Sequence, residues 1–245
     1  MMNYHQFYKF RVFNKYFIDS LVKGYLYFAS PSQLNDPFDC QIDIGKILLK
    51  IATQKTNNKS TVLKEFSKLE TTLLDMQNGI NTFGICSFSL DNMETLMWSH
   101  YANDHKGACV MYSFPEPFLV DEENRNNIFG VAKVAYDSNP VTNWIKTMTT
   151  AKLYRMDVFY QEFTSLLLTQ KSPSWQYERE VRIVRTKTGP LKIHSSFIKQ
   201  ICFGLQTSEE DIELITKIAG EISSDIEFCR IIRGDDDFGL KLIKI

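Results

Sequence analysis

The sequence predicts an α+β fold: a single domain over residues 1–245, with a curved, mainly antiparallel sheet and flanking helices. Short apolar runs of strand length, such as TFGICSFS at 82–89 and GACVMYSF at 107–114, recur between polar segments. Other segments carry apolar residues at helical spacing. Neither an internal repeat nor a linker divides the chain, so one core is expected. A chain of 245 residues can bury about 70–75% of its unfolded surface without a metal or a disulfide.

The first forty residues predict a strand, a short helix and a second strand. FYKFRVF is an aromatic strand, and NKYFIDSLVKG has helical spacing with Gly24 as its stop. YLYFAS is the second strand. The SPSQLNDPFDC segment that follows is turn-rich, because Pro31 and Pro37 interrupt regular structure.

The rest of the chain predicts helices and strands in mixed order. Residues 44–77 form one or two helices, with a mobile loop or insertion at 50–62. The later elements are expected in the order helix or loop NMETLMWSHYANDHKG, strand GVAKVAYD, helix 151–170, strand IKQICFGL, helix SEEDIELITKIAGEI, strand IEFCRIIR and strand FGLKLIKI. Ser208 and Asp211 stand where a capping box would start the last helix.

Composition argues against several partners. A formal net charge of -1 gives no sign of a field that attracts nucleic acid or a membrane surface, although a local basic groove stays open. No run of eighteen apolar residues occurs, and the N-terminus lacks an apolar stretch of signal-peptide length. Five widely spaced cysteines without a CxxC pair fit reduced thiols. We therefore expect a cytoplasmic protein with no membrane partner, and leave its oligomeric state open.

The stretch PSWQYEREVRIVR at 173–185 concentrates charge beside apolar residues. If all of it is one strand, alternation puts Glu178, Glu180 and Arg182 on one face. Tyr177, Val181 and Ile183 then share the other face. The ionic face is either the solvated side of an edge strand or one wall of a cleft.

Two further polar clusters are candidates for chemistry. Asn35, Asp36 and Asp39 in NDPFD serve either turn formation or ligand binding. TLMWSHYANDHKG gathers Trp98, Ser99, His100, Tyr101, Asp104 and His105 within eight residues, as a polar pocket wall would. The histidine spacing does not fit a helical metal motif, so no metal is expected. No GxSxG elbow occurs, which disfavours a serine hydrolase.

Three motifs together resemble a prokaryotic family of domains of unknown function. They are LYFASPSQLNDPFD, then CSFS followed by LMWSHYANDHKG, and finally WQYEREVR. The resemblance covers roughly residues 7–205. It implies no activity.

The layout also resembles the ADP-ribosyltransferase superfamily. There an opening strand carries a basic residue, here Lys9 or Arg11, and a helix and a strand beginning after a glycine follow. A middle strand carries Ser or Tyr, and a late strand carries a glutamate, often as E-x-E. In such enzymes a carboxylate stabilises the oxocarbenium-like ribose, a cation holds the pyrophosphate, and an aromatic ring stacks on nicotinamide.

The resemblance implies site residues. Glu180 is the expected catalytic carboxylate, because in E-x-E members the second glutamate holds the ribose, and Glu178 orients the acceptor or supports the site. The catalytic set is Glu180, Glu178, Tyr101 and His100, and the NAD-binding set is Lys9, Arg11, Ser87, Ser89, Trp98, Asn35, Asp36 and Arg182.

The leading expectation is therefore ADP-ribosyl transfer or NAD cleavage, with NAD as the substrate. The acceptor is a protein or a nucleic acid, as in a toxin or a phage-defence effector. Two alternatives stay open. One is a noncatalytic module that senses a nucleotide, and the other is a metal-dependent phosphoesterase or nuclease that uses Asp36, Asp39, His100, His105 and Glu180.

Overall fold

The computed structural model describes residues 3–53, 71–150, 156–235 and 238–245. The strands are β1 Tyr4–Arg11, β2 Tyr25–Phe28, β3 Gly84–Ser89, β4 Ala108–Pro115, β5 Ile128–Lys133, β6 Ala135–Tyr136, β7 Gln170–Lys171, β8 Glu180–Arg185, β9 Gly189–Lys192, β10 Ile198–Phe203, β11 Glu227–Arg233 and β12 Leu240–Lys244. The α-helices are α1 Lys15–Lys23, α2 Ile44–Thr53, α4 Thr95–Tyr101, α5 Glu116–Val120, α6 Pro140–Thr150, α7 Met156–Thr169 and α8 Glu209–Ile222, and residues 71–79 are also helical. Short 3-10 helices are η1 Pro31–Gln33, η2 Ile80–Thr82, η3 Pro173–Glu178 and η4 Ser195–Phe197.

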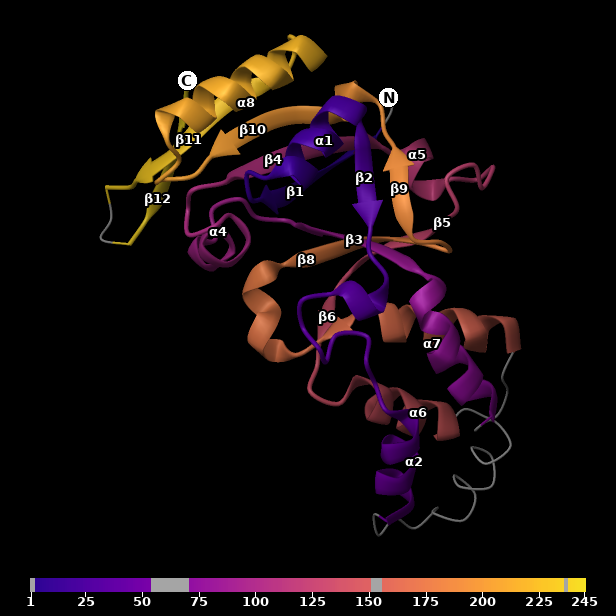
Figure 1. Cartoon of the computed structure of the whole chain (residues 1–245). Coiled ribbons are helices and arrows are strands. Elements are labelled where there is room, and N and C mark those ends of the chain that lie inside the picture. The colour runs from indigo at the N-terminus through magenta and orange to yellow at the C-terminus, as the bar shows by residue number, and fades with distance from the viewer. Residues whose placement is uncertain (1–2, 54–70, 151–155, 236–237) are drawn as a thin grey trace.

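One large sheet organises these elements in the order β12-β11-β10-β4-β1-β3-β8-β5 (Figure 1). Its neighbouring strands are antiparallel except for β10 and β11. Strands from both ends of the chain meet in it. The expected α+β fold with a mainly antiparallel sheet and flanking helices is confirmed.

The sheet splits between β1 and β3. β1 pairs with β4 along its whole length, but with β3 only through Tyr8 and Ser89. Beyond that pair the two strands diverge. Residue Ala29, just after β2, bonds to Ile85 of β3, at N–O distances of 2.9 and 2.7 Å. The split therefore leaves room between two halves of one sheet.

Helices cover both faces. On one face α1 and α8 pack over a core that includes Phe7, Val110 and Ile183 (Figure 1). On the other face, α4 covers the β1-β4-β10-β11 half, while α2, α6 and α7 cover the β3-β8 half. Glu180 and Arg182 alternate with Val181 and Ile183, so they lie on this second face between the two groups of helices.

The helix-end signals predicted at Gly24 and Ser208 are confirmed, and the structure adds a cap at Asn14. Asn14 accepts hydrogen bonds from Tyr16 and Phe17 at the start of α1, and Gly24 ends it with φ of 61°. At α8 the Ser208 side chain accepts from the Asp211 N–H. These caps set both ends of α1 and the start of α8.

Two expectations about the chain need revision. Residues 173–185 are not one strand, because Ser172 and Pro173 start the 3-10 helix η3 and Arg179, at φ 43°, ends it. Tyr177 therefore lies outside β8 and does not share a strand face with Val181. The predicted loop at 50–62 lies largely outside the described residues, as does the start of the helix predicted at 151–170.

Two further properties concern the cysteines and the helices. Each of the five cysteines is free and buried. The helices that the structure describes include none with the length and apolarity to cross a membrane.

Candidate functional site

The charged face of β8 is a buried ion-pair network. Arg182 has no exposed surface, and it binds Asp39 with both terminal nitrogens, at 3.0 Å from Nη1 to Oδ1 and 2.5 Å from Nη2 to Oδ2. Its Nε donates to Glu180 at 2.7 Å, and Nη1 also donates to the Leu168 carbonyl. The face is therefore not solvated, and the edge-strand interpretation is wrong.

Lys171 adds a second cation to this network. Its Nζ lies 2.6 Å from Glu178 and 3.3 Å from Glu180, and 3.8 Å from Asp39. Three carboxylates thus face two cations, which leaves one excess negative charge if all five groups are ionised. An uncompensated buried charge is costly, so the cluster favours an additional proton or an incoming positive charge.

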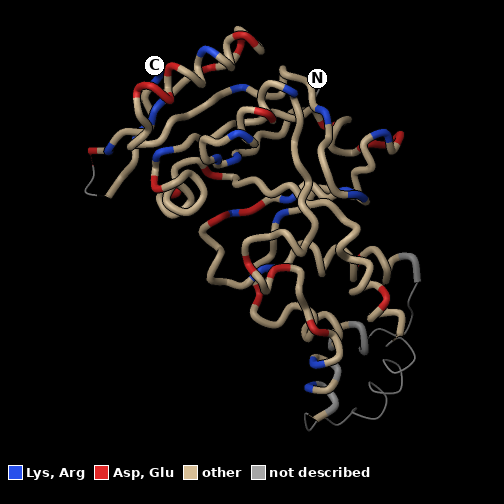
Figure 2. The backbone as a smooth tube through the Cα atoms, in the orientation of Figure 1, with Lys and Arg blue, Asp and Glu red and all other residues tan. Residues whose placement is uncertain are grey.

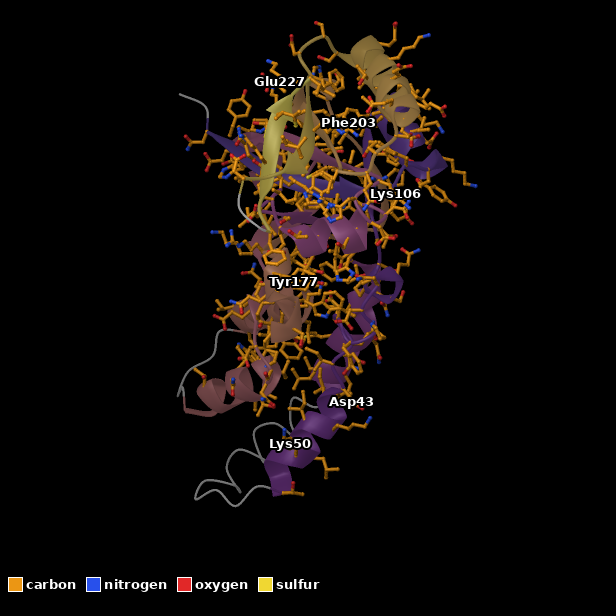
Figure 3. The ribbon with its side chains drawn as sticks, turned by 90° about the vertical axis from the view of Figure 1, so that its left-hand side faces the viewer. Asp43, Lys50, Lys106, Tyr177, Phe203 and Glu227 are labelled. Atoms are coloured by element: carbon orange, nitrogen blue, oxygen red, sulfur yellow. The ribbon has the colours of Figure 1, made fainter. Side chains whose placement is uncertain are left out.

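Tyr101 of α4 joins the cluster from the opposite side. Its hydroxyl donates to Glu178 at 2.5 Å and accepts from the Asn35 side chain at 2.9 Å. The WSHY and WQYERE motifs therefore converge, as predicted, although they lie far apart in the sequence. Figure 3 shows Tyr177 between the upper sheet and the lower helix α2, which starts just after Asp43 and contains Lys50.

These groups line a cavity of about 310 Å³ at the split of the sheet, which we call the site cavity. Its lining includes Glu178, Glu180 and Tyr101 together with Lys9 and Arg11 of β1. Figure 2 shows the acidic and basic residues that follow one another where η3 passes into β8. A larger cavity of about 430 Å³ lies between α2 and the start of α6, and shares only Lys171 with the carboxylate cluster.

The environments of the two glutamates push their pKa values apart. Burial raises the pKa of Glu178, and the charges and hydrogen bonds of Lys171 and Tyr101 oppose this only in part. Burial acts in the same sense on Glu180, but the charge and hydrogen bonds of Arg182 outweigh it, with help from Lys171, and lower the pKa of Glu180 to about 2. Such divergence separates a permanent anion from a group able to take up a proton.

We expect carbon NMR of the side-chain carboxyls to resolve this difference. Glu178 should titrate above its ordinary value of 4.5 and Glu180 at about 2. Because its pKa is raised, Glu178 contributes stability that is present below 4.5 and lost as pH rises through the folded pKa. Glu180 contributes stability that is present above 4.5 and lost as pH falls through about 2. Two independent titrations at ordinary values would contradict the network.

Besides Arg182, three predicted site residues do not line the site cavity. His100 is exposed and its ring lies 6.1 Å from that of Tyr177 at the surface, so it does not approach the carboxylates. Trp98 is fully buried in the core, with Nε1 bonded to the Asn92 carbonyl, and cannot stack on a ligand. Asp36 accepts from the Phe38 N–H, which is turn chemistry.

The other predicted residues divide between lining and support. Lys9, Arg11, Ser87 and Asn35 line the site cavity, and Lys9 donates to the Ser87 carbonyl at 2.7 Å. Ser89 also lines it, but its hydroxyl donates to the Glu178 carbonyl. Arg182 is enclosed by protein, so its role is to hold Glu180 and Asp39 rather than a cofactor.

The sequence interpretation missed Lys171 and assigned Asp39 only to the metal alternative. Lys171 follows LLLTQ at residues 166–170, and lysine is almost never fully buried unless it is paired, so no local signal marked it as part of the site. The metal alternative is not favoured, because Arg182 occupies Asp39 and His100 lies apart. In the described part of the chain no three His, Cys, Asp or Glu side chains gather as a metal site.

Comparison with known proteins adds one match. Residues 97–183 match a family model described as a protein of unknown function, DUF2971. The match runs from α4 into β8 and includes Tyr101, Lys171 and Glu180, but not β1 or NDPFD, and it covers less than half of the chain. It supports the expected likeness to a domain of unknown function over this segment. No curated protein and no solved structure matches the sequence.

Proposed function

We propose that this chain is an ADP-ribosyltransferase-like enzyme that cleaves NAD and transfers ADP-ribose to a protein or nucleic-acid acceptor. The observation that carries the proposal is the charge pattern of the site cavity. Its lining combines an excess carboxylate charge at Glu178 and Glu180 with the cations Lys9 and Arg11. NAD has the matching pattern, with a cationic nicotinamide ring beside an anionic pyrophosphate.

The chemistry assigns a different role to each glutamate. Breaking the bond between the ribose C1′ and the nicotinamide nitrogen sends the bonding electron pair to the departing ring, and leaves positive charge on the ribose. Glu180, ionised because of Arg182, stabilises that charge in a largely dry setting. The acceptor oxygen or nitrogen then bonds to C1′, and its proton passes to Glu178, whose raised pKa suits a base.

The neighbouring side chains support these roles. Lys171 and Tyr101 hold Glu178 at its position, and Arg182 holds Glu180. Lys9 and Arg11 are placed for the pyrophosphate. A use as toxin or phage-defence effector follows only if the acceptor is essential to a host or a phage.

The test is incubation of the purified chain with NAD, with a metal chelator present, followed by chromatography for nicotinamide. Release of nicotinamide is the expected result, with ADP-ribose formed when water is the acceptor. NAD binding without release would instead favour the nucleotide-sensing alternative. Phosphodiester hydrolysis that requires a divalent metal, together with no NAD binding, would overturn the proposal.

A further inference from the structure

A second cavity adjoins the site cavity at β1. It has a volume of about 370 Å³, and its walls include Tyr16 and Tyr25 together with Tyr112. Lys9, Arg11 and Tyr27 line both this cavity, which we call the tyrosine cavity, and the site cavity. The two cavities therefore lie next to each other at the two cations, where β1 diverges from β3.

The cations at this junction are unpaired. Across the described residues, neither Lys9 nor Arg11 has a carboxylate within ion-pair distance. Lys9 donates to the Ser87 carbonyl and lies over the Phe88 ring, and the Arg11 guanidinium lies 5.5 Å from the centre of the Phe17 ring. A partly buried guanidinium without an acceptor has five donors available, in a geometry that suits phosphate.

Tyr112 provides an independent observation that points to a ligand. Its side chain is only 5% exposed, and no hydrogen bond among the described residues uses its hydroxyl. Burial raises the pKa of Tyr112, so the hydroxyl is a neutral donor. The hydroxyl lines the tyrosine cavity and is accessible there, so a bound molecule can accept its hydrogen bond.

We propose that the tyrosine cavity binds the nucleoside-phosphate half of a dinucleotide, which is the ADP part if the substrate is NAD. A planar base suits walls rich in tyrosine rings, its polar edge can meet the Tyr112 hydroxyl, and its phosphates reach Lys9 and Arg11 at the junction. The site cavity alone, at about 310 Å³, then holds the half that reacts. This inference rests on the proposed function for the identity of the substrate.

The experiment measures binding of ADP and of nicotinamide mononucleotide by calorimetry. Tyr112→Phe keeps the ring that packs 5.7 Å from those of Phe88 and Phe114, so it should fold. We expect it to weaken ADP binding about 5-fold through the lost hydrogen bond, and to leave nicotinamide mononucleotide unaffected. Arg11→Met should weaken both ligands about 10-fold or more, because both carry phosphate.

Two matched variants control for surface effects. Tyr4→Phe changes an exposed tyrosine of β1, and Arg125→Met an exposed arginine paired with Glu123, both outside the two cavities. Neither should alter binding of ADP.

The outcomes separate this inference from the proposed function. If ADP does not bind, or binds Tyr112→Phe as well as the unaltered chain while NAD is still cleaved, the tyrosine cavity assignment is wrong and the proposed activity stands. If ADP binding depends on Tyr112 and Arg11 but no nicotinamide is released, the assignment stands and the enzyme proposal fails.

Discussion

Replacing Arg182 with Met should lower the free energy of unfolding by about 3–5 kcal/mol, because removal of one partner leaves buried charge uncompensated. In the unaltered chain the guanidinium forms ion pairs with both Asp39 and Glu180. In the variant Lys171 would be the one cation left to neutralise three carboxylates. For a chain of this size, about 2–4 °C per kcal/mol makes the expected loss in melting temperature roughly 10 °C. Thermal unfolding followed by circular dichroism measures it.

The loss in melting temperature of the Arg182→Met variant should depend on pH. In the unaltered chain the stability supplied by Glu180 is present above its unfolded value of 4.5 and disappears as pH falls through about 2. In the variant Glu180 loses the guanidinium that lowers its pKa, so its protonation in acid relieves the uncompensated charge. The difference in melting temperature should therefore be largest near neutral pH and shrink toward acid.

Arg179→Met is the matched control. Arg179 lies three residues away, its side chain is 65% exposed, and it pairs with Asp91 at 3.0 Å. An exposed pair contributes at most about 1 kcal/mol. Equal losses in melting temperature in the two variants would show that the buried Arg182 network contributes no more to stability than an exposed ion pair.

The fold was accessible from sequence wherever local periodicity and local chemistry agree. The strand β1, the helix α1 with Asn14 and Gly24, and the apolar strands β3 and β4 all carry their own signals. The boundary between η3 and β8 could not be predicted from the sequence, because the alternation of Glu178 and Glu180 is equally compatible with one continuous strand. Pro173 after Ser172 favours the turn, and Arg179 in the left-handed region completes it.

The site was predictable in part. Helical spacing puts Met97, Trp98 and Tyr101 toward the core and leaves His100 outward. The buried side of α4 can therefore be predicted from its sequence. The pairing of Asp39 with Arg182 spans 143 residues and depends on how the β3-β8 half packs on the NDPFD turn. No local pattern contains that information. Convergence of Tyr101 with Glu178 was inferred from chemistry, since neither motif alone supplies a complete site.

Replacing Glu180 with Gln should reduce nicotinamide release by about 10²-fold or more, with the loss in kcat rather than in NAD binding. The amide keeps the shape of the side chain but removes the charge that the developing ribose cation needs. The fold should tolerate the change, because Asp39 still binds Arg182, and two carboxylates then face two cations. Timed assays of nicotinamide release measure the loss in kcat, and calorimetry measures NAD binding separately.

Glu178→Gln supplies the comparison, because it removes the same charge from the same buried cluster. If Glu178 takes the acceptor's proton, this variant should lose ADP-ribose transfer more than it loses NAD binding. Hydroxide should take the proton instead at higher pH and restore part of the rate. Glu180→Gln should show no such recovery, because hydroxide cannot replace the fixed negative charge that Glu180 places beside the ribose. A Glu180→Gln chain that retains full activity would remove Glu180 from the mechanism. Equal losses of activity in both variants, at every pH, would mean that activity depends on the net charge of the cluster. It would then not depend on which glutamate carries that charge.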